Sequence, residues 1–181
     1  MATLPEGFTA HFRDPKVWKR NGQWYMVLGA QSLDLKGHLV LFTSDTLENW
    51  TFQGTIAGSG KNGLDNFGYM WECPDLFELD GRDVLIVSPQ GLEPDGLKYH
   101  NTHQSGYFVG TLDDHSYQYT HGAFEELDRG FDFYAQQTFL DESGRRLFLS
   151  GGWGCLIKEK NIIRPFLING YTASRSRESS V

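Results

Sequence analysis

Long apolar runs, a cysteine framework and an excess of basic residues are all missing from this chain of 181 residues. No stretch approaches the roughly 20 apolar residues of a membrane-spanning helix, and the start at Met1–Pro5 lacks the apolar region of a secretory signal. Two cysteines, Cys73 and Cys155, do not make a disulfide scaffold, so we expect a reducing compartment, the cytoplasm. A net charge of −7 leaves no basic face for nucleic acid. The sequence therefore predicts neither a membrane nor a nucleic acid as partner.

Helical periodicity is also scarce, whereas aromatic residues (14%) and glycines (21) are frequent, as in an all-β chain with many tight turns. Three segments repeat one pattern of strand, glycine turn and second strand, which is the signal of a hairpin. The turn glycines are Gly22, Gly81 and Gly144, spaced by 59 and 63 residues. Further strands are expected at 38–43 and 106–110. The spacing predicts blades of a β-propeller, about three of them, although a propeller typically needs at least four to close.

Two short phrases place carboxylates beside the start of a predicted hairpin: Phe12-Arg13-Asp14-Pro15 and Trp71-Glu72-Cys73-Pro74-Asp75. Aligning the repeats on their turn glycines puts Arg13 opposite Glu72, so the two carboxylates, Asp14 and Glu72, occupy nearly equivalent places. Paired carboxyl groups are what glycoside hydrolysis requires, one as acid and one on the far side of the anomeric carbon. Simpler roles remain open, because an Asp before Pro commonly caps a turn and a single Glu is commonly ion-paired.

The phrases F-R-D-P-K-V-W, W-E-C-P-D-L-F and G-F-D-F-Y-A-Q-Q-T-F resemble glycoside hydrolase family 32, the five-bladed propeller of invertases, from about Pro5 to Gly151. Q-S-G-Y-F-V-G and S-P-Q-G-L resemble its bacterial intracellular branch. The resemblance implies that residues 1–152 are a partial propeller catalytic domain, about blades two to four. It also implies retaining hydrolysis of the fructosyl bond of sucrose or sucrose 6-phosphate, with no cofactor and no metal.

Site roles also follow from the resemblance. Glu72 would be the acid/base and Asp14 the transition-state stabiliser that binds fructose hydroxyls. Sugar contacts are expected from four further residues, Arg13, Trp71, Asp132 and Tyr134. Trp71 is equally expected in the core, and Asp132 and Tyr134 are equally expected as structural groups at a strand end. An inverting arabinan-type propeller would need carboxylates roughly 6.5 to 9.5 Å apart, and the R-D-P and E-C phrases argue against it.

The chain departs from the family in two places. The family's nucleophile is an Asp in a W-M-N-D-P-N-G phrase, and nothing like that phrase precedes Phe12. Suitable synonymous codons for Ile162–Val181, read in another frame, give Y-P-T-V-F-N-K-W-L-H-G-L-T-I-P-R-E-L-S, which contains the phrases that the family has there. We therefore predict that the reading frame shifted between Gly151 and Lys158 and that residues 153–181 are an unstructured tail. The chain alone is expected to be inactive and to self-associate through exposed blade edges, with a non-catalytic sugar-binding remnant as the alternative.

Overall fold

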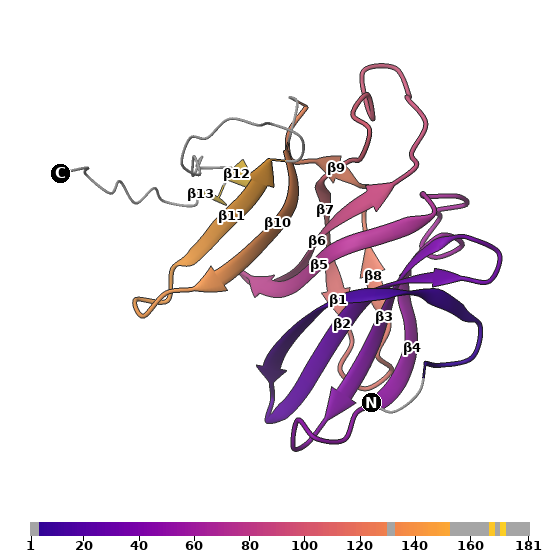
Figure 1. Ribbon diagram of the computed structural model, residues 1–181. Helices are drawn as coiled ribbons and strands as arrows, with labels where there is room; N and C mark the ends of the chain where they lie inside the picture. Colours follow the sequence, from indigo (N-terminus) through magenta and orange to yellow (C-terminus); the bar gives the residue numbers. More distant parts are fainter. Residues whose placement is uncertain (1–3, 130–132, 153–166, 169–170, 173–181) are drawn as a thin grey trace.

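The computed structural model describes residues 4–129, 133–152, 167–168 and 171–172, and among these it contains strands and turns but no helix. The first sheet is an antiparallel meander in chain order, β1 (Phe8–Arg20), β2 (Gln23–Ser32), β3 (Gly37–Ser44) and β4 (Thr51–Gly58). The second repeats this order with β5 (Met70–Leu79), β6 (Arg82–Gln90), β7 (Gly106–Leu112) and β8 (Tyr119–His121), and β9 (Glu125–Glu126) also pairs with β7. The two meanders are successive units of one repeat (Figure 1).

A third unit is present as a two-stranded antiparallel sheet, β10 (Phe133–Leu140) and β11 (Arg146–Gly152). The prediction of an all-β chain with three repeating hairpins is therefore confirmed. Most of the predicted tail, 153–181, lies outside the described residues. Within it the structure describes β12 (Leu167–Ile168) and β13 (Tyr171–Thr172), which pair with each other.

The predicted turns close the first hairpins of the first two sheets. Asn21 and Gly22 have φ of 49° and 85°, and Asp80 and Gly81 have φ of 47° and 75°. Two consecutive residues with positive φ make a type I′ turn, whose twist matches that of the strands that it joins. Because glycine and asparagine or aspartate tolerate this conformation best, the turn residues determine where each hairpin reverses.

The main core lies between the first and second sheets. Alternate residues of β2, among them Tyr25 and Val27, meet Trp71 and Leu85 of the second sheet, and all four are at most 2% exposed. The opposite face of β2 is apolar as well, since Met26 and Leu28 pack with Phe8 and Phe12 of β1 in a separate cluster. A sheet with two apolar faces is typically covered by other structural elements on both faces.

Close approach of the first two sheets depends on two glycines. A Cβ atom at Gly29 would lie 1.8 Å from the backbone oxygen of Trp71, and one at Gly37 would lie 2.7 Å from its indole ring. Trp71 also stacks on Phe108 of β7 with ring centroids 5.5 Å apart. The absence of side chains at these two positions lets β5 lie against the first sheet at the point where the candidate site is built.

Polar contacts at a regular sequence spacing join the strands β1, β5 and β10. Lys16 on β1 donates to Asp75 on β5 at 3.1 Å and to the backbone oxygen of Thr138 on β10 at 2.6 Å. The carboxyl group of Asp75 is fully buried and also accepts from the Thr138 backbone N–H. The three sheets are therefore held in register where their first strands meet.

Candidate active site

A bulge interrupts the first strand of each unit at the same place in the repeat. The pairing register shifts between Arg13 and Lys16 in β1, between Glu72 and Asp75 in β5, and between Tyr134 and Gln137 in β10. The residue after the start of each bulge has positive φ: 60° at Asp14, 49° at Cys73 and 57° at Ala135. A bulge turns the flanking side chains out of the ordinary alternation of a strand. Arg13, Glu72 and Tyr134 are consequently equivalent residues of three blades.

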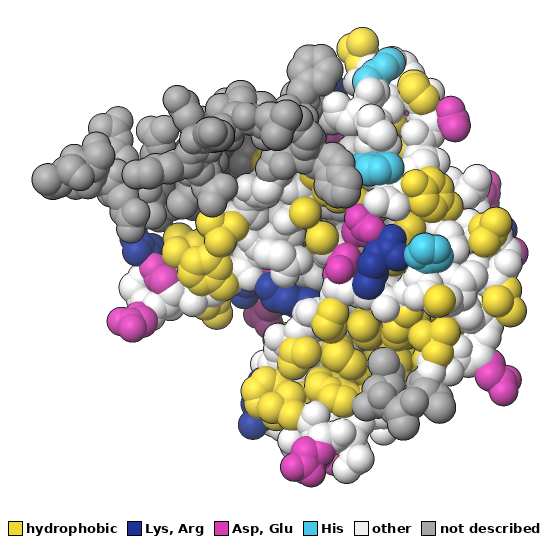
Figure 2. All heavy atoms as spheres, in the orientation of Figure 1, with side chains coloured by type: hydrophobic (Ala, Val, Ile, Leu, Met, Phe, Trp, Pro, Cys, Tyr) yellow, Lys and Arg dark blue, Asp and Glu magenta, His cyan; other side chains and the backbone are white. Residues whose placement is uncertain are grey.

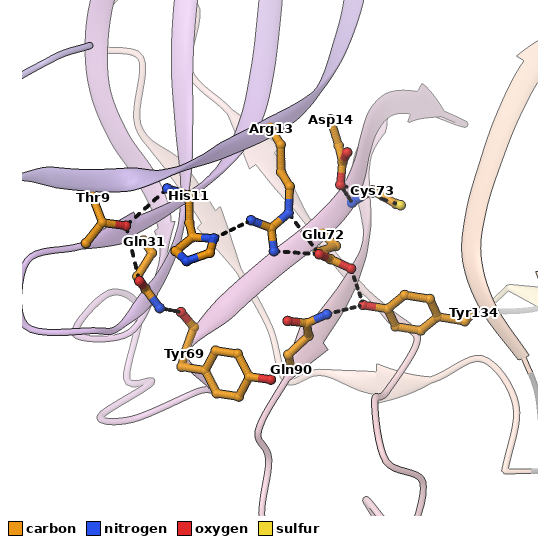
Figure 3. Close-up of polar contacts among 10 residues, drawn as sticks. All are labelled: Thr9, His11, Arg13, Asp14, Gln31, Tyr69, Glu72, Cys73, Gln90 and Tyr134. Carbon is orange, nitrogen blue, oxygen red and sulfur yellow. Dashed lines mark hydrogen bonds and ion pairs between the residues drawn. The ribbon is translucent and has the colours of Figure 1, made fainter. Parts of the chain in front are cut away.

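These three equivalent side chains meet around the carboxyl group of Glu72 (Figure 3). Arg13 donates to Oε1 of Glu72 from Nε at 2.8 Å and from Nη2 at 2.6 Å. The Tyr134 hydroxyl donates to Oε2 at 2.6 Å. The Glu72 side chain keeps 17% of its surface exposed and that of Arg13 keeps 33%, so the pair faces solvent only in part. Figure 2 shows acidic and basic side chains meeting in the middle of this face of the molecule.

Tyr134 is fixed from its other side as well. Gln90 donates from Nε2 to the Tyr134 hydroxyl oxygen at 3.0 Å, and the tyrosine itself is 4% exposed. Burial, together with the hydrogen bond to Glu72, raises the pKa of Tyr134 well above its usual value, so that its hydroxyl stays protonated. The protonated hydroxyl of Tyr134 is therefore available as a hydrogen-bond donor to Glu72.

Asp14 lies beside Glu72 and is anchored to the residue next to it. Its Oδ2 accepts from the Cys73 backbone N–H at 3.0 Å, and the Cys73 Sγ lies 3.7 Å from the same oxygen. Burial first, and then the charge of Asp14, raises the pKa of the Cys73 thiol to about 12. A thiol in this state is neutral near pH 7 and is a poor nucleophile. Cys73 is thus a neutral neighbour of the two carboxylates.

Trp71 is a core residue in this structure, which is one of the two roles expected of it. It is fully buried, and its indole N–H donates to the backbone oxygen of Phe67 at 2.7 Å. Its side chain follows the alternation of β5 toward the first sheet, whereas Glu72 lies at the bulge. Asp132, another expected sugar contact, lies outside the described residues.

Two residues near the site were missed by sequence reasoning. His11 lies with its Nδ1 2.9 Å from Nη1 of Arg13, and strand alternation could have placed it, because it precedes Arg13 by two positions on β1. Tyr69 is 45% exposed at the rim of the site, and its backbone oxygen accepts from Gln31 at 2.8 Å. Its position depends on the approach of separate segments, which leaves no local sequence signal.

The described residues hold no group of three or more His, Cys, Asp or Glu side chains arranged to bind a metal ion. In the same part of the chain, no helix is long and apolar enough to span a membrane. The candidate site consists of two carboxyl groups, a guanidinium group, a tyrosine and a glutamine. Side chains of these kinds can transfer protons and bind hydroxyl groups.

Comparison with known proteins gives consistent results. Residues 1–166 match the Glycosyl hydrolases family 32 N-terminal domain. A sucrose-6-phosphate hydrolase from Bacillus subtilis is 65% identical over 150 residues, covering 83% of this chain and 31% of the relative. The structure of a sucrose-6-phosphate hydrolase from Lactobacillus gasseri superimposes with a TM-score of 0.77 at 31% identity, over 93% of this chain and 37% of that one.

A third similar protein is the Bombyx mori GH32 β-fructofuranosidase BmSUC1, a point mutant of which was solved in complex with sucrose. That structure superimposes with a TM-score of 0.75 at 41% identity over 86% of this chain and 32% of that one. The chain thus spans about a third of the length of the relatives that it matches. The neighbours support the predicted fold class, a part of a β-propeller, and none of the sheets in the described residues closes into a ring.

Proposed function

Because the chain belongs to glycoside hydrolase family 32, we propose that Glu72 and Asp14 are part of the active site of an enzyme that hydrolyses the fructosyl bond of sucrose or sucrose 6-phosphate with retention. The observation that carries the proposal is the carboxyl group of Glu72 at the meeting point of three blades. Both of its oxygens accept hydrogen bonds there, and Asp14 lies beside it. The substrate class is suggested by the relatives, which are a sucrose-6-phosphate hydrolase and a β-fructofuranosidase.

In the proposed reaction, Glu72 is the acid that protonates the glucosyl oxygen as the bond to the fructosyl anomeric carbon breaks. It then acts as the base that activates water in the second step of a retaining mechanism. Asp14 accepts hydrogen bonds from fructose hydroxyls, and its negative charge stabilises the positive charge that develops on the sugar ring. Arg13 and Tyr134 hold the carboxyl group of Glu72 in place. The nucleophile implied by the family resemblance is in a phrase that these 181 residues do not contain.

The test uses a hybrid enzyme, in which residues 5–151 of this chain replace the matching segment of the Bacillus subtilis relative. We expect the hybrid to release glucose or glucose 6-phosphate from one of the two substrates, and the chain of 181 residues to release neither. In the hybrid, Glu72→Gln should lower kcat at least about 100-fold, because general acid catalysis typically contributes that much or more. Glu78→Gln, on the exposed face of β5, is the matched control and should retain activity. Full activity of the Glu72→Gln hybrid would overturn the assignment.

The sugar is the one partner that the site itself favours, since a partly exposed ion pair flanked by polar side chains suits hydroxyl groups. Neither a nucleic acid nor a membrane is proposed as a partner. The cytoplasm remains the proposed compartment, on the basis of the low number of cysteines.

A further inference from the structure

The hydrogen bonds at Glu72 distinguish its two oxygen atoms. A carboxylate offers about four lone-pair positions, two on each oxygen. Oε1 accepts two N–H groups of Arg13, so both of its positions are used. Among the described residues, Oε2 accepts one hydroxyl group, that of Tyr134, which leaves one of its positions for a proton.

The hydroxyl group of Tyr134 also has two distinct hydrogen-bond partners, Glu72 and Gln90. A phenolic hydroxyl both donates and accepts, and the direction of its proton is set by what its oxygen accepts. Gln90 donates to that oxygen at 3.0 Å, so the Tyr134 proton is turned toward Glu72, 2.6 Å away. Gln90 reaches this position from the end of β6, where its strand pairs with Met70, two residues before Glu72.

We propose that Oε2 of Glu72 carries the transferable proton and that Gln90 is a positioning residue that keeps the Tyr134 hydroxyl directed at this oxygen. The proposal rests on the proposed function of Glu72 as acid/base. In the transfer, the O–H bond at Oε2 breaks and an O–H bond forms at the glucosyl oxygen. The electron pair of the bond to the fructosyl carbon stays with that oxygen, and Glu72 is left as a carboxylate. Arg13 and Tyr134 are already placed to donate to that charge.

The closing experiment begins with a readout that needs no catalysis. The chain of 181 residues is labelled with ¹³C at the Cζ atom of its eight tyrosines, and Tyr134→Phe identifies the Tyr134 signal in the NMR spectrum. We expect Gln90→Leu to shift that signal, because the hydroxyl oxygen loses a donor. Gln90→Glu should shift it further and differently, because a carboxylate at position 90 accepts the Tyr134 proton and draws it from Glu72.

The matched control is Gln53→Leu. Gln53 also donates from Nε2 to a side-chain hydroxyl, that of Thr43 at 2.7 Å, but it lies on β4, away from the site. It should leave the Tyr134 signal unchanged. An unchanged Tyr134 signal in both Gln90 variants would overturn the proposal. If Gln90→Leu fails to fold, Gln90→Glu, which keeps the size and shape of the side chain, decides the question.

The second readout is kinetic and uses the hybrid enzyme. Loss of one uncharged hydrogen bond is worth about 1 kcal/mol, so Gln90→Leu should lower kcat about fivefold with KM unchanged, whereas Gln53→Leu should change neither. An effect on KM alone would mean that Gln90 contacts the substrate and would overturn the positioning role. If the unmodified hybrid is inactive, the proposed function fails, while the Tyr134 signal still reports on the Gln90 contact.

Discussion

At the scale of single residues, the site depends on backbone conformations that most side chains avoid. Asp14, Cys73 and Ala135 all have positive φ, at equivalent bulge positions of three strands. Such strained positions persist where the surrounding structure holds them, and they are frequent at functional sites. Each bulge brings the preceding residue, Arg13, Glu72 or Tyr134, to the common meeting point.

The Cys73 thiol gives a residue-scale prediction. With a pKa of about 12 against an ordinary value near 8.5, its thiolate fraction at pH 7 is lower by roughly three orders of magnitude. In a Cys155→Ser background, Cys73 should therefore react with iodoacetamide roughly a thousandfold more slowly than a free cysteine. Asp14→Asn should speed the reaction, since the charge of Asp14 contributes to the raised pKa. Rapid labelling of the folded chain, equal to that in urea, would contradict the prediction.

Gly29 gives a second residue-scale prediction. A methyl group there would lie 1.8 Å from the Trp71 backbone oxygen, so β2 and β5 must separate to admit it. We expect Gly29→Ala to lower the free energy of unfolding by about 2 kcal/mol, as overpacking of a core typically does, measured by urea denaturation. Gly122→Ala is the control, because its Cβ would lie 3.9 Å from the nearest atom, the Val109 oxygen. Equal stability of the two variants would show that the sheets do not approach so closely.

At the scale of the elements, buried ion pairs hold successive sheets together. Asp75 is fully buried and pairs with Lys16, and Asp83 pairs with Arg20 of β1 at 2.7 Å. Removing one partner of a buried pair leaves an uncompensated charge, which is far more unfavourable than the loss of an exposed pair. These pairs determine how β1 lies against the second sheet.

Lys16→Met should accordingly lower the free energy of unfolding by about 3 kcal/mol. The double variant Lys16→Met with Asp75→Leu should recover part of this loss, because no charge is left buried. Lys36→Met removes an exposed pair with Asp34, in which the side chains are 43% and 62% exposed, and should change stability by less than about 1 kcal/mol. Chemical denaturation measures all three, and a similar effect of the Lys16 and Lys36 variants would refute the structural role.

At the scale of the whole molecule, the stack of sheets presents apolar surface at one end. On β10 and β11 three large side chains are exposed, Phe139 at 45%, Leu140 at 58% and Leu149 at 43%. Exposed apolar faces and strand edges favour association with another sheet. The second sheet already buries one such face against this hairpin, in the cluster of Phe77, Ile86 and Phe148.

We therefore expect the chain of 181 residues to self-associate at micromolar concentration, as seen by sedimentation velocity. Leu149→Lys should weaken the association, because burying the exposed side chain at position 149 would then remove the lysine charge from water. Leu97→Lys is the control, since Leu97 is 83% exposed outside the strands of the second sheet and should have no effect. A monomeric wild-type chain at these concentrations would contradict the prediction.

Much of the fold could be predicted from the sequence because it depends on local chemistry. Asn-Gly, Asp-Gly and Ser-Gly turns between apolar runs, repeated about every 60 residues, predicted the hairpins, and the structure has them at Gly22, Gly81 and Gly144. The short motifs that resemble glycoside hydrolase family 32 also identified the family. The alignment of Arg13 with Glu72 in the sequence agrees with the structure, in which both residues precede equivalent bulges. The catalytic roles of Glu72 and Asp14 stay predictions that the hybrid enzyme tests.

The sequence by itself determined the repeating hairpins, their turns and the family of this protein, since each depends on residues that are near one another in the chain. Only the tertiary structure decided which side chains meet. It directed Trp71 into the core, and it brought Tyr134 to Glu72 across 62 residues and Gln90 to Tyr134 across 44. The bulges and the stacking of sheets control these contacts. Neither can be derived from one strand, because the direction of a side chain at a bulge depends on the partner strand and on the neighbouring sheet.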